Sequence, residues 1–564
     1  MAFPRPRVLR LAALLSASAL ALAACTGSAE EPSPRGPLTR GPEGEAPSDP
    51  GATAEPVAGG TLVAALSSDP GQLNPAITTS GGTHAASELI YNGLVELTPD
   101  LEPVPELAES WEIEEDGALY RFRLREGVTW HDGEPFTSAD VVFTFEEALL
   151  ELHSRTRASV GAALESVTAP DDLTVEFRFA EPYAPLLLQL DVTEAPILAR
   201  HVYEGTDVQE NPANLEPVGT GPFTLESYQP GAELRLAKNQ DYFKEDLPYL
   251  DEVVLRIIPD EANQVVALEA GEVDWLFGAP GPDLERLQGD DRFGFLETAV
   301  NPGGSNCIMT VGLNLERPIF ADVRVRRALG QALDTEQFLE RVLFGQGSVA
   351  TAPISSGIPF AHAQDLEGMP TYDPEAAADL LDEAGWVRDG DGTRTAQGVD
   401  GVEDGTPLSF DFLHFPTFSD YGELLRAQLA EVGAEVQLVP LEPPVFAETV
   451  FTARDFDSNI ISYCNGADPE IGVKRMYLSS NIGPVPFSNA AAYSDPEVDR
   501  LFEEARTTID TDARTPIYAE LQERLVEDLP YLWIVETTSN RVYSTECSGF
   551  SAAGHFAETA FCDR

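Results

Sequence analysis

The sequence has little positive charge for its length of 564 residues. It contains 35 Lys and Arg residues against 95 Asp and Glu residues, which gives a formal net charge of −60 at pH 7. This charge excludes nucleic acids and anionic lipid surfaces as electrostatic partners, because both are polyanions. The acidic residues define no ligand by themselves, and we interpret them as a solvated surface that suits a saline medium.

The sequence also lacks the common catalytic motifs. It contains no HExxH zinc helix, no GxSxG or SxxK nucleophile motif and no GxxxxGK phosphate loop. His131 and Asp132, in the stretch Trp130-His131-Asp132-Gly133, are too few for a metal site, and Asp-Gly instead favours a tight turn. We therefore predict a protein that is not an enzyme and that holds no metal or cofactor. An exported hydrolase with an unrecognised site is the alternative.

Long uncharged apolar stretches are absent beyond the N-terminal region, where three arginines precede an apolar run at residues 11–22. The sequence Ala-Ala-Cys follows this run and resembles a bacterial lipobox. We predict that residues 1–24 are a lipoprotein signal peptide and that Cys25 is lipidated; an ordinary secretory signal with a chance cysteine is the alternative. Residues 25–58 are rich in Pro, Gly and Ser and lack aromatic side chains, which predicts a disordered linker.

Cysteine is scarce as well, with five residues in the whole chain. If Cys25 carries lipid, four remain, and an even number in an exported protein predicts two disulfides with three possible connectivities. Cys547 and Cys562 are close in sequence, and closing the loop between them would stabilise the fold by about 3 kcal/mol. That pairing leaves Cys307 for Cys464. Four inert buried thiols are the alternative.

Strand and helix patterns alternate along the rest of the chain. Alternating or continuous apolar residues predict strands at 61–66, 119–124, 174–179 and 253–258. Apolar residues at helical spacing predict helices at 138–150, 261–270, 323–343, 374–384, 421–432, 496–505 and 515–527. This alternation predicts a mixed α/β protein with more than one lobe.

Five stretches, in this order, resemble the extracytoplasmic solute-binding proteins of ABC importers, specifically family 5, the oligopeptide- and dipeptide-binding group. Together they span roughly residues 60–540. The first stretch comprises Tyr91–Glu96, Pro105–Trp111, Tyr120–Phe122, Leu124–Gly133 and Ala139–Val142. The others are Gly219–Phe223 with Asn239–Phe243, Ala267–Asp274, Pro318–Leu329, and Tyr372–Ala377 with Ala384–Trp386.

The resemblance implies a two-lobe α/β fold, the type II periplasmic-binding-protein fold in its large form with three subdomains and a hinge between the lobes. Residues 59–300 would form lobe I, with a subdomain inserted at about 89–215. Residues 301–532 would form lobe II, and residues 533–564 would return to lobe I. Some oligopeptide binders of this family place cysteines where this chain has Cys307 and Cys464, which favours a bond between these two.

The resemblance also implies a function. The chain would be a lipid-anchored receptor on the outer face of the cytoplasmic membrane, facing the periplasm or the exterior. It would bind an oligopeptide, a dipeptide or a related small solute between its lobes and deliver it to the permease subunits of an ABC importer. We expect a monomer that contacts the membrane through its lipid alone and binds no nucleic acid. A receptor of the same fold used for signalling is a further alternative.

Peptide binders of this family usually carry an aspartate that pairs with the α-amino group of the ligand. Here the corresponding stretch, Ser462–Glu470, is one residue shorter, and the place of the acid falls on Gly466 or Asn465. Recognition of a free α-amino group by charge is therefore in doubt. The candidate ligand-binding residues are Tyr463, Asn465, Asp468, Tyr91, Asn92 and Trp275; for Tyr91 and Trp275, core packing is the alternative.

Overall fold

The computed structural model describes the chain from residue 56 onward, and this part belongs to one compact unit that starts at Ser48. The described residues are 56–298, 306–364, 366–388, 390, 392–551 and 556–562. The predicted signal peptide, Cys25 and nearly all of the predicted linker lie outside them. Among the described residues, no helix has the length and apolar character needed to cross a bilayer.

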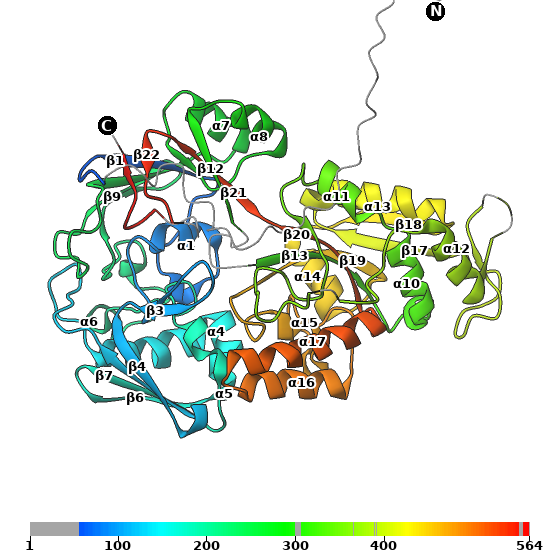
Figure 1. Cartoon of the computed structure of the whole chain (residues 1–564), viewed down its shortest axis with the longest axis horizontal. Helices are drawn as coiled ribbons and strands as arrows, with labels where there is room; N and C mark the ends of the chain where they lie inside the picture. The colour runs from blue at the N-terminus through cyan, green and yellow to red at the C-terminus, as the bar shows by residue number, and fades with distance from the viewer. Residues whose placement is uncertain are drawn as a thin grey trace, which may run out of the picture. The chain divides into compact units, whose positions relative to one another are not determined.

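A seven-stranded mixed sheet has the order β12-β21-β11-β1-β10-β9-β8 (Figure 1). Its central strand β1 pairs in parallel with both β10 and β11, and the end of β1 is buried. Continuous apolar runs are typical of such strands, because both of their faces are covered. The strands are β1 (Thr61–Leu66), β8 (Phe223–Gln229), β9 (Glu233–Lys238), β10 (Glu252–Ile257), β11 (Trp275–Leu276), β12 (Phe293–Thr298) and β21 (Ser539–Ser544).

A four-stranded antiparallel sheet, with the order β4-β5-β7-β6, lies between β1 and β8 in the sequence. The strands are β4 (Ala108–Glu114), β5 (Leu119–Leu124), β6 (Leu164–Asp171) and β7 (Thr174–Phe179). β7 alternates buried and half-buried residues, as its period-two pattern predicts. The predicted helix from 138 is also present, as α2 (Ser138–Phe143) followed by further helical turns to Leu152. We call the part built on these two sheets the first lobe.

The second lobe is built on a six-stranded sheet with the order β14-β20-β13-β19-β17-β18. The strands are β13 (Asn306–Leu313), β14 (Ser348–Val349), β17 (Ser409–His414), β18 (Glu435–Pro440), β19 (Ser458–Asn465) and β20 (Tyr531–Thr537). The helices around it include α10 (Val323–Gln331), α11 (Thr335–Arg341), α12 (Pro374–Glu383), α13 (Ser419–Glu431), α15 (Val473–Tyr477), α16 (Pro496–Thr507) and α17 (Thr511–Asp528).

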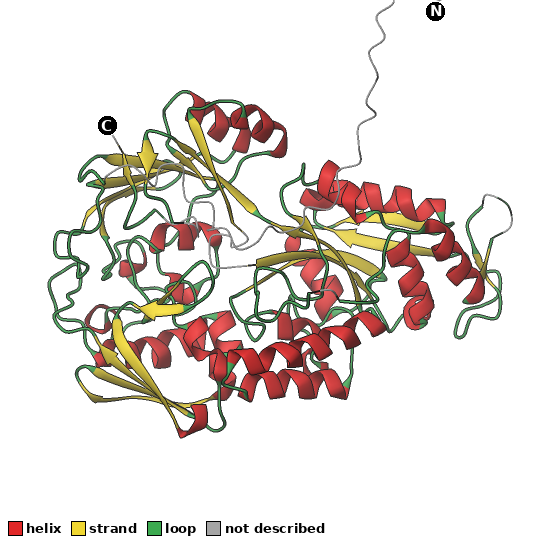
Figure 2. Ribbon diagram, in the orientation of Figure 1, coloured by secondary structure: helices red, strands yellow, loops and turns green. Residues whose placement is uncertain are grey.

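Helices cover both faces of this sheet, as Figure 2 shows. Successive residues of one strand enter different cores, because side chains alternate across a sheet. Tyr531 and Trp533 of β20 pack in one core with residues of α16 and α17, whereas Leu532 and Ile534 pack in another with residues of α10, α12 and α13. The sheet is therefore the rigid centre of the second lobe.

The chain passes between the two large sheets twice. β12 belongs to the seven-stranded sheet and β13 to the six-stranded sheet, while β20 and β21 make the reverse passage. β12 pairs with β21, and β13 pairs with β20. The predicted boundary at residue 532 falls inside β20, which stays in the six-stranded sheet through Thr537. The other lobe boundaries stay predictions.

Both predicted disulfides are present, so the alternative of four free thiols is wrong. Cys307 of β13 is bonded to Cys464, which lies directly opposite it on β19. Cys547 is bonded to Cys562, and their strands β22 (Cys547–Ser548) and β23 (Phe561–Cys562) pair near the end of the chain.

Candidate functional site

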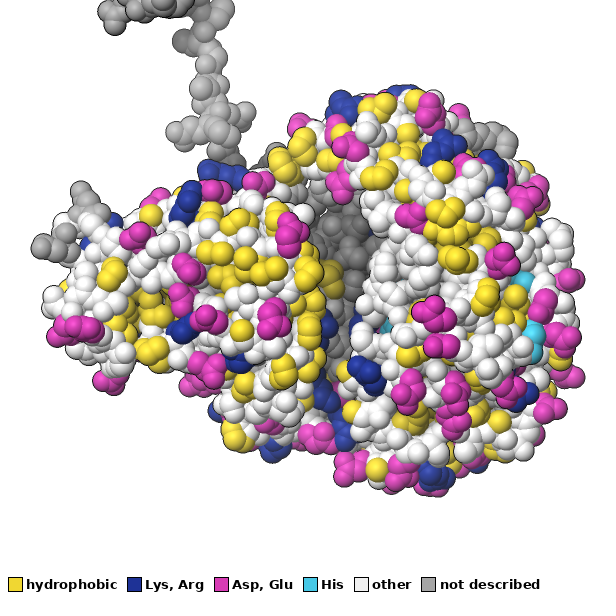
Figure 3. Space-filling view, turned by 180° about the vertical axis from the view of Figure 1, so that it is seen from behind, with side chains coloured by type: hydrophobic (Ala, Val, Ile, Leu, Met, Phe, Trp, Pro, Cys, Tyr) yellow, Lys and Arg dark blue, Asp and Glu magenta, His cyan; other side chains and the backbone are white. Residues whose placement is uncertain are grey.

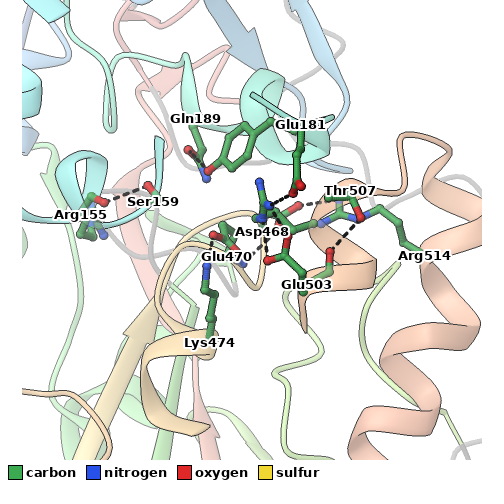
Figure 4. A network of polar contacts seen from close by, with 12 residues as sticks. Arg155, Ser159, Glu181, Gln189, Asp468, Glu470, Lys474, Glu503, Thr507 and Arg514 are labelled. Atoms are coloured by element: carbon green, nitrogen blue, oxygen red, sulfur yellow. Dashed lines mark hydrogen bonds and ion pairs between the residues drawn. The ribbon is translucent and has the colours of Figure 1, made fainter. Parts of the chain in front are cut away.

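A groove separates the two lobes on the face that Figure 3 shows, and several Lys or Arg side chains lie beside its lower part. On the second-lobe side, the segment after the Cys464 bond leaves the sheet at the end of β19 and leads to α15. On the first-lobe side, residues between 155 and 194 approach this segment, and we call the two sides its walls. Figure 4 shows Arg155, Ser159, Glu181 and Gln189 near Asp468, Glu470 and Lys474. This region is the candidate binding site.

Tyr463 and Asn465 end β19 and are both buried. The Tyr463 hydroxyl donates a hydrogen bond to the carbonyl of Ser488 at 3.0 Å. The Asn465 side-chain oxygen is buried and has no hydrogen-bond partner in the part of the chain that the structure describes. Gly472 makes room for it, because a Cβ atom on Gly472, whose φ is 113°, would lie 2.5 Å from that oxygen. Asn465 therefore holds a buried acceptor, packed against Gly472, that no described group uses.

Arg475 on α15 lies next to the end of β19, beside Tyr463 and Cys464. Its Nη2 donates to the carbonyl of Cys464 at 3.2 Å, and its guanidinium is 5.9 Å from the centre of the Tyr463 ring. Its Nε is buried and has no hydrogen-bond partner among the described residues. Burial lowers the pKa of Arg475, because the charged form loses its water.

Arg155 and Glu194 form the opposite wall in the first lobe, with Nη2 of Arg155 2.8 Å from a carboxylate oxygen of Glu194. Burial raises the pKa of Glu194 to about 7, and the charges of Arg155 and Arg475 oppose this rise. Asp191 lies nearby, accepts a hydrogen bond from the backbone of Glu194 at 3.3 Å, and raises the same pKa. Because Arg475 belongs to the second lobe, this coupling joins the two walls.

The lobes also touch at the rim of the groove, where α16 meets α17. Nη2 of Arg506 is 3.2 Å from Glu181 Oε2, and its guanidinium is 5.9 Å from the centre of the Tyr183 ring. Ile509 packs against Gly117, where a Cβ atom would overlap the isoleucine side chain. We call these residues the rim contact.

Asp468 does not face the groove with a free carboxylate. It is fully buried and accepts two hydrogen bonds from Arg514, at 2.7 and 3.0 Å (Figure 4). It also accepts one from the backbone of Glu470 at 2.9 Å, and Glu470 pairs in turn with Lys474. Asp468 thus fixes the loop between β19 and α15 to α17.

The other three predicted residues lie in the first lobe. Trp275 is fully buried in its core, with ring centroids 4.6 Å from Phe550 and 5.4 Å from Phe556. Tyr91 is fully buried in the same core. Asn92 donates to Glu106 at 2.6 Å and accepts from Thr220 at 2.8 Å. The structure brings Tyr463, Asn465 and Asp468 together on one segment, apart from these three. Their ligand roles stay predictions.

Sequence reasoning missed Arg155, Glu194 and Arg475. None of the three lies in a recognisable motif. The one available signal is that basic residues are scarce in this acidic chain, with 35 in all, and Arg155 and Arg475 are two of them. Trp130–Gly133 forms the predicted turn, with the Gly133 amide donating to the Trp130 carbonyl at 2.8 Å. Among the described residues, no cluster of His, Cys, Asp and Glu could hold a metal ion.

Asn92 belongs to a buried network that should make stability depend on pH. Lys244 Nζ is 2.6 Å from Glu106 and 2.7 Å from Glu558. Burial raises the pKa of Glu106 from its ordinary value of 4.5 to about 7, although Lys244 opposes the rise. The folded chain therefore holds a proton between pH 4.5 and 7 that the unfolded chain has released.

We expect this contribution to stability to be complete below pH 4.5 and to be lost as the pH rises through 7, because the pKa is higher in the folded state. Glu106→Gln should flatten the fall of the unfolding free energy over this range by up to about 1 kcal/mol per pH unit. Urea unfolding at several pH values measures the slope. The control is Glu109→Gln, because Glu109 is exposed and paired with Arg123. This variant should leave the slope of unfolding free energy against pH unchanged. The same slope in Glu106→Gln as in the original chain would contradict the prediction.

Comparison with known proteins identifies the class. Residues 102–484 match the model for bacterial extracellular solute-binding proteins, family 5, middle region. The chain belongs to this family, as its motifs predicted. Its members are substrate-binding proteins that act outside the cytoplasm, so the receptor role is confirmed at that level.

Individual relatives agree. The oligopeptide-binding protein AppA of Bacillus subtilis is 27% identical over 559 residues, which cover 97% of this chain and 96% of the relative. The dipeptide-binding protein of Escherichia coli is 28% identical over 525 residues, covering 87% and 92%. The structure of B. subtilis AppA with a nonapeptide superposes with a TM-score of 0.72 at 25% identity, over 90% of this chain and 100% of that one.

Proposed function

We propose that the chain is a lipid-anchored receptor that binds a peptide or a related small solute between its lobes and delivers it to an ABC permease. Cys25 would carry the lipid, on the outer face of the cytoplasmic membrane. The observation that carries the proposal is that Arg475 of the second lobe lies close enough to Arg155 and Glu194 of the first lobe for their charges to act on one another. The peptide-binding relatives support the choice of solute.

Such a site works by closure. When a solute touches both walls, it stabilises the arrangement in which the lobes are close, and water leaves the groove. Polar contacts become stronger as the surroundings become less polar. The permease would then recognise the closed arrangement of the lobes, which forms mainly when the solute is bound.

The amine end of a peptide would meet Asn465. A side chain at Gly466 is blocked, because a Cβ atom there would lie 2.7 Å from Cγ2 of Ile471. Of the two positions where the family's acid falls, only Asn465 can hold a side chain without displacing Ile471. Its amide oxygen supplies a dipole in place of a full charge, which weakens the preference for a protonated amine over a neutral N–H group.

The proposal predicts that solute stays bound during gentle purification. The chain is produced in a compartment where disulfides form, purified under mild conditions and then denatured. Mass spectrometry identifies the small molecules that are released. Adding the identified solute back should raise the unfolding midpoint with concentration, by an amount equivalent to about 2.7 kcal/mol at one hundred times Kd. The solute should be recovered chemically unchanged.

Two outcomes would contradict parts of the proposal. Conversion of the added solute to products would support the hydrolase alternative. Mass spectrometry of the N-terminal peptide of the membrane-bound chain should find an acylated Cys25, and an unmodified Cys25 would contradict the lipid anchor.

A further inference from the structure

We infer that the second lobe contains a further ligand site, separate from the groove, which binds a small organic cation with an apolar body. The site is a cavity of about 620 Å³ beside β20. The residues that line it all belong to the second lobe, and none belongs to the walls of the groove or to the rim contact. The inference therefore goes beyond the proposed function and does not depend on it.

The cavity lies where the edge of the six-stranded sheet is left uncovered. The edge strand β14 pairs with β20 only at Val535 and Glu536, and the Ala350 amide then donates to the Ile534 carbonyl at 3.2 Å. Ile534 is also an extra residue of β20 relative to β13. Such a bulge bends the strand and interrupts regular pairing. No described strand covers β20 at Leu532 on this side, and residues of the loop before α12 line the cavity instead.

The cavity has an apolar floor and a polar mouth. Leu333, Leu532 and Ile534 line it and are buried, whereas Glu336 and Thr371 line it and are exposed. Cavities that bind small molecules measure about 300–1,000 Å³ and are mainly apolar, with a few polar groups that orient the ligand. Water is held weakly by an apolar floor. The size and the lining therefore suit a small molecule with an apolar body.

The charged groups of the cavity are carboxylates. Asp334 and Glu336 both line it, and no Lys or Arg is among its described lining residues. Arg327 lies near the loop before α12, but it donates to the carbonyls of Gly368 and Val526. An anion would be repelled by the two carboxylates and a cation attracted. The net charge of −60 acts in the same direction, because it draws cations to the surface.

Both carboxylates have free acceptor capacity. The Glu336 side chain makes no hydrogen bond or ion pair with any described residue. Asp334 accepts from the Gln337 backbone at 3.4 Å and from its side-chain amide at 2.7 Å. A carboxylate has about four acceptor positions, so two remain on Asp334. The cavity can therefore accept several N–H groups from a ligand.

His362 adds an acceptor to the same lining. Its Nδ1 lies 2.7 Å from the Ile354 carbonyl, which can only accept, so Nδ1 carries the proton of the neutral ring. Nε2 then keeps its lone pair and lies 3.4 Å from the Thr351 hydroxyl. A primary ammonium group has three donors and no acceptor, and it is complementary to this set.

Methionine methyl resonances can locate the ligand. The chain has four methionines, and Met369 lines the cavity. Met476 lies beside Arg475 on α15, at the wall of the groove. The purified chain with ¹³C-methyl methionine is titrated with tryptamine, an indole that carries a primary ammonium, and Met369→Leu assigns the resonance. We expect the Met369 resonance to shift and the Met476 resonance to stay, with a Kd of about 1 mM or below for a probe of this size.

A second probe tests the charge. Indole-3-propionate has the same ring and linker but ends in a carboxylate, and it should bind about 10-fold more weakly or less than that. Asp334→Asn combined with Glu336→Gln should remove most of this preference, while asparagine keeps the helix cap. The control combines Glu520→Gln with Glu523→Gln, which removes the same charge from exposed positions of α17 outside the cavity and should keep the preference. Urea unfolding midpoints show whether both variants are folded.

The outcomes decide for or against the site. A preference for tryptamine that is lost in the cavity variant and kept in the control supports the inference. A shift of Met476 without Met369 would place the probe in the groove and overturn it. No shift of Met369 with either probe, equal affinities for the two probes, or a preference that survives in the cavity variant would overturn it as well. None of these results bears on the proposed function, which is tested by the solute that co-purifies.

Discussion

Replacing Arg514 by methionine is expected to lower the free energy of unfolding of the second lobe by about 3–5 kcal/mol. The reason is its partner: Asp468 is fully buried and takes two hydrogen bonds from Arg514. Without the guanidinium, the carboxylate stays in the interior with no opposite charge, or the β19–α15 loop must open to water. Urea unfolding followed by tryptophan fluorescence measures the loss.

The matched control is Arg500→Met on neighbouring α16. Arg500 is also paired with carboxylates, those of Glu497 and Glu504, but its side chain is 50% exposed. Exposed pairs contribute about 0–1 kcal/mol, so this variant should change stability little. Combining Arg514→Met with Asp468→Asn should recover part of the loss, because no charge is then left buried. A single Arg514→Met variant as stable as Arg500→Met would contradict the argument.

The second large effect is expected at Gly219, in the Gly-Thr-Gly-Pro-Phe stretch. This stretch docks on the backbone of residues 89–90: the Gly221 amide donates to the Ile90 carbonyl at 2.8 Å. A Cβ atom on Gly219 would overlap that carbonyl oxygen and lie 2.7 Å from its carbon. Backbone cannot move aside as a side chain can, so Gly219→Ala should cost at least about 3 kcal/mol or prevent folding.

Gly278→Ala is the control, because a Cβ atom there would meet nothing within 4 Å. It should unfold at the same urea concentration as the original chain, within about 0.5 kcal/mol. The yield of soluble protein and the unfolding midpoint are compared for both variants. A Gly219→Ala chain with normal yield and midpoint would show that the first lobe can shift at this point.

The sequence predicted the parts of the fold that depend on local patterns. Residues 119–124 and 174–179 alternate apolar and polar side chains, and both form strands of one antiparallel sheet. Thr137 and Asp140 predict a helix start, and the Asp140 carboxylate accepts a hydrogen bond from the Thr137 amide at 2.8 Å. The family motifs supplied the long-range order, including the bond between Cys307 and Cys464.

Other features depend on contacts that no local pattern records. The predicted helix 323–343 is two helices, because the Asp334 side chain caps the second at Gln337. The tie between Asp468 and Arg514 joins residues 46 positions apart. Arg475 became a candidate only when the fold placed it beside Cys464 and near Glu194. Its importance lies in its closeness to the other lobe, which a sequence does not display.

If the lobes close on a solute as we propose, the rim contact affects how well a permease distinguishes a loaded receptor from an empty one. Arg506, Glu181 and Ile509 join the lobes through contacts that need no solute, so any stabilisation that they supply would raise the share of empty receptors with the loaded shape. Each 1.4 kcal/mol multiplies that share tenfold while it is small. An ion pair whose Glu181 side chain is 65% exposed contributes at most about 1 kcal/mol. On the proposed function, the weakness of this ion pair keeps the share of empty receptors with the loaded shape small.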